Sequence, residues 1–236
     1  GVRYEISSIS KLMKRLGLKK LRPRLVPGKP PALEKQVEFI LRYHQIRDFE
    51  KLDEGLVQLF VDGAHLIHQV IPSLCWGDPS DPPFLQTNSS RQRLNILGAY
   101  HPVSQEFIHL TSEANCDASQ VICFLEKVLS HYAHCHSIIL NLDNAPYFHA
   151  LLVQQWLQAH PQVILNPLPA YAPNLNLIER LWRFVKERLV HNRYYARYKT
   201  FRAFTFRLLN RIPTFSTQLK SLINDNFELV FGKFNA

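Results

Sequence analysis

The sequence lacks long apolar runs and paired cysteines. It has no stretch of 18 or more apolar residues and no signal-peptide pattern at its start, which argues against a membrane-spanning or exported protein, so we expect a cytoplasmic one. The four cysteines have no CxxC spacing, which favours reduced core thiols over a disulfide framework. With 236 residues and 46% apolar side chains, the chain can form one sizeable core.

Acidic residues are absent from residues 6–33, which hold eight basic residues, and only one occurs in residues 180–211, which hold ten basic residues. The middle of the chain, residues 34–179, holds fifteen acidic and seven basic residues. A nucleic-acid enzyme has this asymmetry when carboxylates perform its chemistry and Lys and Arg hold phosphates. A basic surface without a partner is the plain alternative, because basic composition alone is a weak indication.

The apolar patterns predict a mixed α/β sheet with helices on its faces. Apolar or alternating runs predict five strands, at residues 56–61, 93–102, 106–113, 137–145 and 162–169. Helical periodicity predicts helices at residues 7–16, 32–49, 121–132, 147–159 and 174–190 and after residue 198. Antiparallel strands come first and alternating helices and strands follow, which is typical of a mixed sheet.

Two side-chain assignments accompany these elements. The helix at residues 32–49 is expected to lie against the main domain through one side, formed by Leu33, Val37, Ile40, Leu41 and His44. The three tryptophans, Trp76, Trp156 and Trp182, are interpreted as core residues.

Two aspartates follow runs that are typical of buried strands. Asp62 comes after residues 56–61 and Asp143 after residues 137–142, so we expect each to end its strand. An acid without a partner in such a place would cost several kcal/mol or take up a proton, and it therefore normally has a cation or hydrogen bonds. If the two strands are neighbours, both carboxylates reach one ion.

Glu179 begins an amphipathic helix whose first turn would point at the ends of those strands. Arg183 and Lys186 share a stripe with it, which suits a metal over a scissile phosphate with DNA continuing along the basic side chains. A small number of hard oxygen ligands selects Mg²⁺ or Mn²⁺. Two such ions about 4 Å apart would activate a water or 3′-hydroxyl and stabilise the leaving oxygen of an in-line displacement.

Each acid also has a local explanation. Asp62 precedes Gly63 and could form a turn, and Asp143 with Asn144 could form an Asx turn. Glu179 could interact favourably with the helix dipole, by about 0.3–1 kcal/mol. The three contexts together favour the metal site over three unrelated local roles.

Several segments resemble motifs of the DDE transposases of the Tc/mariner superfamily, specifically its bacterial insertion-sequence branch. The matching segments are FVDGAH, SSRQRLNILGAY, LDNAPYFHA and LPAYAPNLNLIERLWRFVK, and the resemblance extends over essentially the whole chain. The last is the most specific, because the family repeatedly has a Pro-Tyr-x-Pro-x-Leu-Asn-x-Ile-Glu run. Thirty-five residues separate Asp143 from Glu179, within the family's spacing. Ala170, where Pro is frequent, and Gly63, where many members have Glu, depart from the pattern.

The resemblance implies a ribonuclease H-like fold and a two-metal DDE mechanism, with Asp62, Asp143 and Glu179 as catalytic metal ligands. It implies Mg²⁺-dependent cleavage at the terminal inverted repeats of a transposon, strand transfer into target DNA containing TA, and synapsis by a homodimer. Mn²⁺ would substitute for Mg²⁺. The expected location is the bacterial cytoplasm, in association with the nucleoid.

Residues 1–31 resemble only the end of a helix-turn-helix module and its basic linker, and residues 32–236 resemble the catalytic domain. The family normally has two such modules, so end-specific binding by this segment alone stays open. We expect DNA-phosphate contacts from the basic side chains of the first region and of the Glu179 helix: Lys11, Lys14, Arg15, Lys19, Lys20, Arg22, Arg24, Arg183 and Lys186.

Two other functions fit the same residues: a catalytically silent DNA-binding remnant, and a cellular nuclease of the same fold that acts on RNA–DNA hybrids or junctions. Retention of all three acids argues against the first. The histidines at 131–136 lack a second ligand pair at finger spacing, which disfavours zinc. His149 either approaches the metal site or caps the helix that follows.

Overall fold

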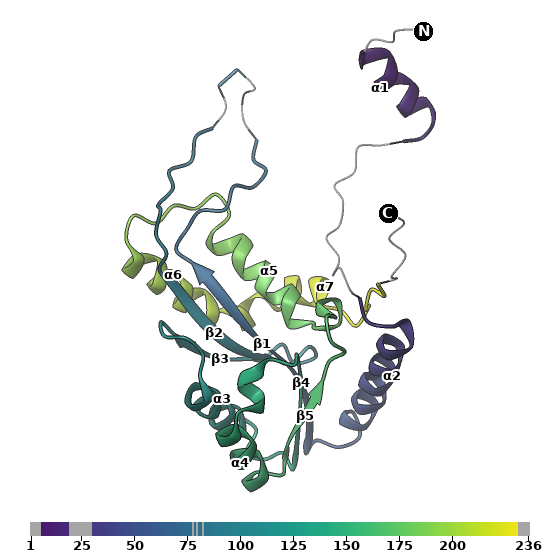
Figure 1. Ribbon diagram of the computed structural model, residues 1–236, viewed down its shortest axis with the longest axis vertical. Helices are drawn as coiled ribbons and strands as arrows, with labels where there is room; N and C mark the ends of the chain where they lie inside the picture. The colour runs from purple at the N-terminus through teal and green to yellow at the C-terminus, as the bar shows by residue number, and fades with distance from the viewer. Residues whose placement is uncertain (1–5, 19–29, 77, 79, 82, 231–236) are drawn as a thin grey trace.

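The centre of the protein is a five-stranded sheet with the strand order β3-β2-β1-β4-β5 (Figure 1). The structure is a computed structural model that describes residues 6–18, 30–76, 78, 80–81 and 83–230. The strands are β1 (Leu56–Ile67), β2 (Arg93–Tyr100), β3 (Phe107–Ser112), β4 (Ser137–Leu142) and β5 (Val163–Pro167). β2 is antiparallel to β1 and β3, whereas β4 is parallel to β1 and β5. The predicted mixed sheet of five strands is confirmed.

Helices cover both faces of this sheet (Figure 1). The α-helices are α1 (Ile6–Arg15), α2 (Leu33–Glu50), α3 (Ala118–His131), α4 (Leu151–Ala159), α5 (Ile178–Leu189), α6 (Tyr198–Asn210) and α7 (Ser216–Leu222). Short 3-10 helices are η1 (Pro146–His149), η2 (Pro173–Leu175) and η3 (Ile212–Phe215). Within the described ranges, no helix combines the length and the apolar content needed to span a membrane.

The alternation of side chains along β1 divides the interior into two apolar cores. Phe60 points into the core formed with α2, α5 and α6, whereas Leu59 and Val61 point into the core formed with α3 and α4. Successive residues of a strand face opposite sides, so the central strands are apolar on both faces. The sheet is therefore held rigidly between helices, and residues at its edge have fixed positions.

The helix α2 packs through a different face from the predicted one. Its buried residues are Gln36, Phe39 and Tyr43, whereas Leu33, Val37 and Leu41 are exposed. Gln36 can be buried because its side-chain amide donates to the carbonyls of Pro31, at 3.0 Å, and Val230, at 2.9 Å. Of the predicted face only Ile40 packs against the core, where it is partly buried. The rest of the prediction was wrong, because Phe39 and Tyr43 provide the apolar contacts instead.

The connection between β1 and β2 projects from the sheet as a long loop (Figure 1). Its large apolar side chains are solvent-exposed, with Leu74, Trp76 and Phe84 each more than nine-tenths accessible. The assignment of Trp76 to the core was therefore wrong. Trp182 is a core residue, and Trp156 packs half-buried against the core of α3 and α4.

Candidate active site

β1 and β4 bring two of the three predicted carboxylates to the same edge of the sheet. Their parallel pairing ends at Val61 and Leu142, and Asp62 and Asp143 are the next residues of the two strands. β1 itself continues to Ile67, because Asp62 still pairs with Gly98 of β2. The expectation that Asp62 ends its strand was thus wrong, whereas Asp143 does follow the last residue of β4.

Asp62 is half-buried and receives a hydrogen bond from Trp182, whose Nε1 lies 3.0 Å from Oδ2 of the carboxylate. Burial raises the pKa of Asp62 to about 7, and the negative charges of Glu179 and Asp143 add to this rise. The hydrogen bonds from the Gly63 backbone and from Trp182 act in the opposite direction. Without a cation, this carboxyl therefore keeps its proton to a higher pH than an exposed aspartate does.

The other two carboxylates are more accessible. Asp143 is exposed, and its Oδ1 accepts a hydrogen bond from the backbone N–H of Ala145 at 3.3 Å, so it also has the turn contact considered above. Glu179 is the second residue of α5 and is also exposed, and within the described residues its carboxylate has no hydrogen bond or ion pair. Partial burial raises the pKa of Glu179, with Asp143 adding to the rise and Lys186 and Arg183 opposing it.

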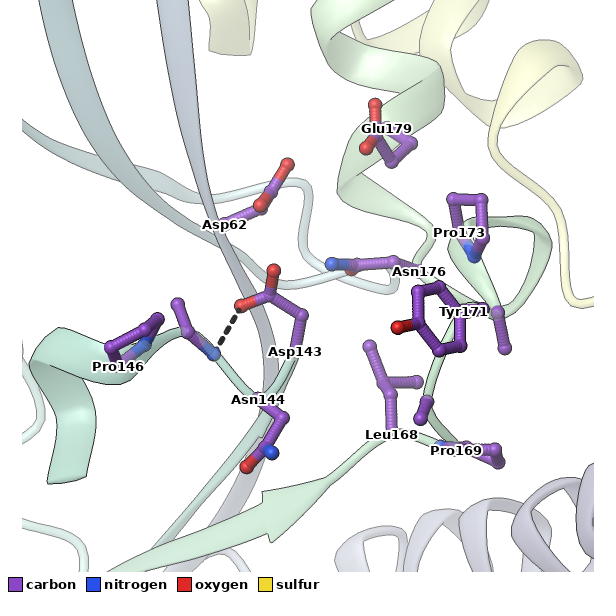
Figure 2. A pocket seen from close by; sticks show the side chains of 13 residues that line it. Asp62, Asp143, Asn144, Pro146, Leu168, Pro169, Tyr171, Pro173, Asn176 and Glu179 are labelled. Carbon is purple, nitrogen blue, oxygen red and sulfur yellow. Dashed lines mark hydrogen bonds between the residues drawn. The ribbon is translucent and has the colours of Figure 1, made fainter. Parts of the chain in front are cut away.

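The three carboxylates line one pocket of about 500 Å³, and Figure 2 shows them projecting into it from β1, from the end of β4 and from the start of α5. In the part of the chain that the structure describes, no three His, Cys, Asp or Glu side chains already stand close enough to hold a metal ion. The negative charges of the neighbouring carboxylates contribute to the raised pKa values of Asp62 and Glu179.

The donor atoms of the pocket fit a divalent cation. Asn176 is only 4% exposed and lines the pocket beside the acids. Its Nδ2 donates to the carbonyl of Val61 at 3.3 Å, which ties the start of α5 to β1, but its buried Oδ1 has no partner in the described residues. Together, this unpartnered amide oxygen and the three carboxylates form a set of hard oxygen donors of the kind that Mg²⁺ and Mn²⁺ prefer.

The sequence profile of the family described as "DDE superfamily endonuclease" matches residues 58–202. The match spans more than half of the chain and includes Asp62, Asp143 and Glu179. The chain belongs to the DDE superfamily of endonucleases. A comparison with curated proteins finds no match.

Solved structures of similar fold belong to the Mos1 mariner transposase. The Mos1 mariner paired end complex with Mn has a TM-score of 0.63 at 15% identity, over 92% of this chain and 71% of that chain. The Mos1 strand transfer complex has a TM-score of 0.60 at 14% identity, over 94% of this chain and 71% of that chain. The paired end complex was also solved with Mg, with a TM-score of 0.61 at 14% identity over 92% of this chain and 71% of that chain. At these identities the likeness shows the fold, and the expected ribonuclease H-like fold of this DDE endonuclease is confirmed.

Beside the carboxylate pocket, the DDE endonuclease has a groove of about 1090 Å³ between α5 and residues 222–228. Glu179 and Arg183 both line it, so the groove and the pocket share a wall. Arg180 fixes the other wall, since its guanidinium donates to the carbonyls of Asn224, at 2.8 Å, and Asn226, at 2.7 Å. Of the predicted stripe, Glu179 and Arg183 line the groove, whereas Lys186 lines neither the groove nor the pocket and acts on Glu179 through its charge.

The remaining basic residues of the prediction are placed only in part. Lys11, Lys14 and Arg15 lie exposed on α1, whose apolar side chains Ile9, Leu12 and Met13 are also about half exposed. Lys19, Lys20, Arg22 and Arg24 lie outside the described residues. The boundary between residues 31 and 32, and the DNA contacts of all these side chains, stay predictions.

Three residues of the site were missed by the sequence reasoning: Trp182, Gly98 and Asn176. Gly98 is required where it stands, because a Cβ there would lie 2.7 Å from Cη2 of Trp182 and 2.8 Å from Cε2 of Phe107. Trp182 was predicted as a core residue only, although its indole nitrogen also faces Asp62. His149 is not in the pocket lining, and its Nε2 instead lies 2.6 Å from Oδ1 of Asn144, which does line it.

Proposed function

We propose that this DDE endonuclease is a transposase, which cleaves DNA at transposon ends and joins the released 3′ end to a target. The observation that carries the proposal is the meeting of Asp62, Asp143 and Glu179 around one pocket, which shares a wall with a groove that Arg180, Arg183 and Glu228 also line. Three acids that converge from distant parts of the chain and form no ion pair in the described residues suit phosphoryl transfer better than a structural role.

Asp62, Asp143 and Glu179 would hold two Mg²⁺ ions, and Mn²⁺ would substitute. When bound, the ions supply an activated water or 3′-hydroxyl and a positive charge for the leaving oxygen. The chain's own groups fix the acids: the indole of Trp182 orients Asp62, and the turn at Ala145 orients Asp143. Arg183, exposed on the next turn of α5, would hold a phosphate of the strand that enters the groove.

The activity can be tested with a supercoiled plasmid that carries the coding sequence and its flanking DNA. With Mg²⁺ or Mn²⁺ we expect breaks at the two element ends and joining of those ends at TA dinucleotides, located by sequencing the junctions, and no reaction in EDTA. Scattered cuts without joining, or faster cleavage of RNA–DNA hybrids, would instead indicate a cellular nuclease. Binding of DNA without any cleavage in either metal would indicate a silent remnant.

The proposed partners are transposon ends, a target containing TA, and a second copy of the chain. The exposed apolar side chains of the β1–β2 loop support assembly, because a monomer rarely exposes a group of large apolar residues without an interaction partner. The expected position beside the bacterial nucleoid follows from the DNA substrate and stays a prediction.

Changing Trp76 and Phe84 together to Ser is expected to weaken self-association on DNA by roughly 30-fold or more, since an aromatic anchor typically contributes about 2 kcal/mol. Analytical ultracentrifugation of protein bound to an end duplex measures the effect. Leu151→Ser is the matched control, because Leu151 is equally apolar and 73% exposed, but lies on α4. Equal dimer content in the loop variant and in this control would exclude the loop from the interface.

A further inference from the structure

Tyr171 lies at the rim of the carboxylate pocket with an exposed side chain and an unusual backbone conformation. Its side chain is 72% exposed although it lines the same pocket as the three acids. Its backbone has a φ of +60°, a left-handed conformation that residues other than Gly, Asn and Asp rarely adopt. Such strain persists only where the surrounding structure imposes it, and it gathers at functional sites. An exposed aromatic ring gains nothing from burial here, so the folded state alone does not explain it.

The chain around Tyr171 holds its backbone in a fixed place. Leu168 and Ala172 on either side are buried, and the N–H of Leu168 donates to the carbonyl of Leu142 at 2.8 Å, directly before Asp143. Pro169 and Pro173 restrict the turn further. Among the described residues, Tyr171 has no hydrogen bond from its hydroxyl and no aromatic neighbour. The backbone that carries the ring is therefore held in place, and the faces of the ring are open to a ligand.

Figure 2 shows the ring of Tyr171 between Leu168 and Pro173, with its hydroxyl oxygen on the side of Asp143. A molecule whose phosphate lies among the three acids would place the adjoining nucleotide near this ring. Planar bases stack on aromatic rings without regard to sequence, whereas a base inside an intact duplex has both faces covered by neighbouring bases. The matching ligand is a base at a strand end or nick, where one face is free.

We propose that Tyr171 is a stacking platform for the terminal base next to the reacting phosphate. This inference rests on the proposed DNA-joining function and adds a specific contact to it. Stacking would fix the rotation of the terminal nucleotide about its backbone, and so aim the 3′ end into the pocket. The contact favours neither purines nor pyrimidines by hydrogen bonding, so it would serve any terminal sequence.

The probe is a duplex oligonucleotide with 2-aminopurine as its 3′-terminal base, because stacking quenches the fluorescence of this base. Binding is measured in EDTA, where no cleavage occurs. We expect the unchanged chain and Tyr171→Phe to quench the probe, and Tyr171→Leu and Tyr171→Gly to leave it bright. The Leu and Gly variants should also bind about 5-fold to 150-fold more weakly, which corresponds to the loss of one base–aromatic stacking contact.

Tyr171→Gly separates stacking from folding, because glycine adopts a φ of +60° without strain and should keep or raise the melting temperature. Full quenching by the Leu and Gly variants would overturn the proposal, as would loss of quenching in Tyr171→Phe, which would assign the role to the hydroxyl. Asp143→Asn should quench normally without cleaving DNA. If the unchanged protein joins DNA ends but Tyr171→Gly quenches the probe just as fully, the stacking proposal is refuted and the transposase function is not. If the unchanged protein quenches the probe but never joins DNA ends, the transposase function is refuted.

Discussion

Replacement of Asp143 by Asn is expected to lower metal-dependent DNA cleavage by roughly a thousandfold or more. The substitution keeps the shape of the side chain and the oxygen that accepts from the N–H of Ala145, so the turn after β4 should persist. It removes the negative charge at a position where a cation must be held, and loss of several kcal/mol of transition-state stabilisation corresponds to this fall in rate. The cleavage rate at saturating Mn²⁺ measures the effect, and the melting temperature should change little because Asp143 is exposed.

Glu179→Gln should have a comparable effect, and α5 offers its own control. Glu187 is a second exposed glutamate on the same helix, but it does not line the pocket. Glu187→Gln should therefore cleave DNA at close to the normal rate. Because the carboxylates act together, the double variant of Asp143 and Glu179 should be little slower than either single variant. A Glu179→Gln enzyme with more than a tenth of the normal rate would remove Glu179 from the proposed site.

The sheet was predictable because its strands are apolar on both faces. The run at 56–61 is typical of a buried strand. From the sequence, the adjacency of this strand and the strand before Asp143 was only a condition for the two aspartates to meet, and the parallel pairing of β1 and β4 meets that condition. What failed was the end of β1. Asp62 and Gly63 resemble a turn when they are read alone, but the antiparallel partner β2 extends the strand to Ile67. Such pairing depends on residues 26 to 36 positions away, which a local pattern does not contain.

The identity of the acids was readable from the sequence, but their surroundings were not. Trp182 occupies a core position of α5, and nothing in its spacing indicates that the indole nitrogen faces Asp62. Asn176 precedes the helix and resembles a cap. Its Nδ2 instead donates to the carbonyl of Val61 in β1, and its Oδ1 has no hydrogen-bond partner in the described residues. Tyr171 has an ordinary place in a proline-rich turn, and only its backbone conformation distinguishes it. These features arise from tertiary packing.

Asp62→Asn is expected to stabilise the metal-free protein at alkaline pH while it abolishes cleavage. The pKa of Asp62 is about 7 in the folded state and takes its ordinary value of 3.8 in the unfolded chain. Between these values the folded state binds more protons, so the free energy of unfolding falls as the pH rises from about 4 to about 7, and it stays low above that. The difference corresponds to roughly 2–4 kcal/mol at pH 8.

An asparagine at position 62 carries no charge to desolvate, and it can still accept the hydrogen bond from Trp182. The melting temperature in EDTA should therefore rise by roughly 5–15 °C at pH 8 and be unchanged near pH 4. Asp117→Asn is the control, because Asp117 has a lowered pKa and caps α3 through the N–H of Gln120, so its replacement should bring no gain at pH 8. A stability difference that persisted at pH 4 would trace the effect to packing rather than to charge.

Divalent ions should reverse this order of stability. At pH 8, Mn²⁺ is expected to raise the melting temperature of the unchanged chain, since a cation that binds only the folded state stabilises it and also relieves the repulsion at Asp62. The Asp62→Asn chain, which has lost a ligand and has no such repulsion to relieve, should respond much less. A variant that is more stable without metal, less responsive to metal and inactive would show that the charge of Asp62 lowers the free energy of unfolding of the metal-free protein and is needed for metal binding and cleavage. Loss of activity through unfolding cannot produce that combination.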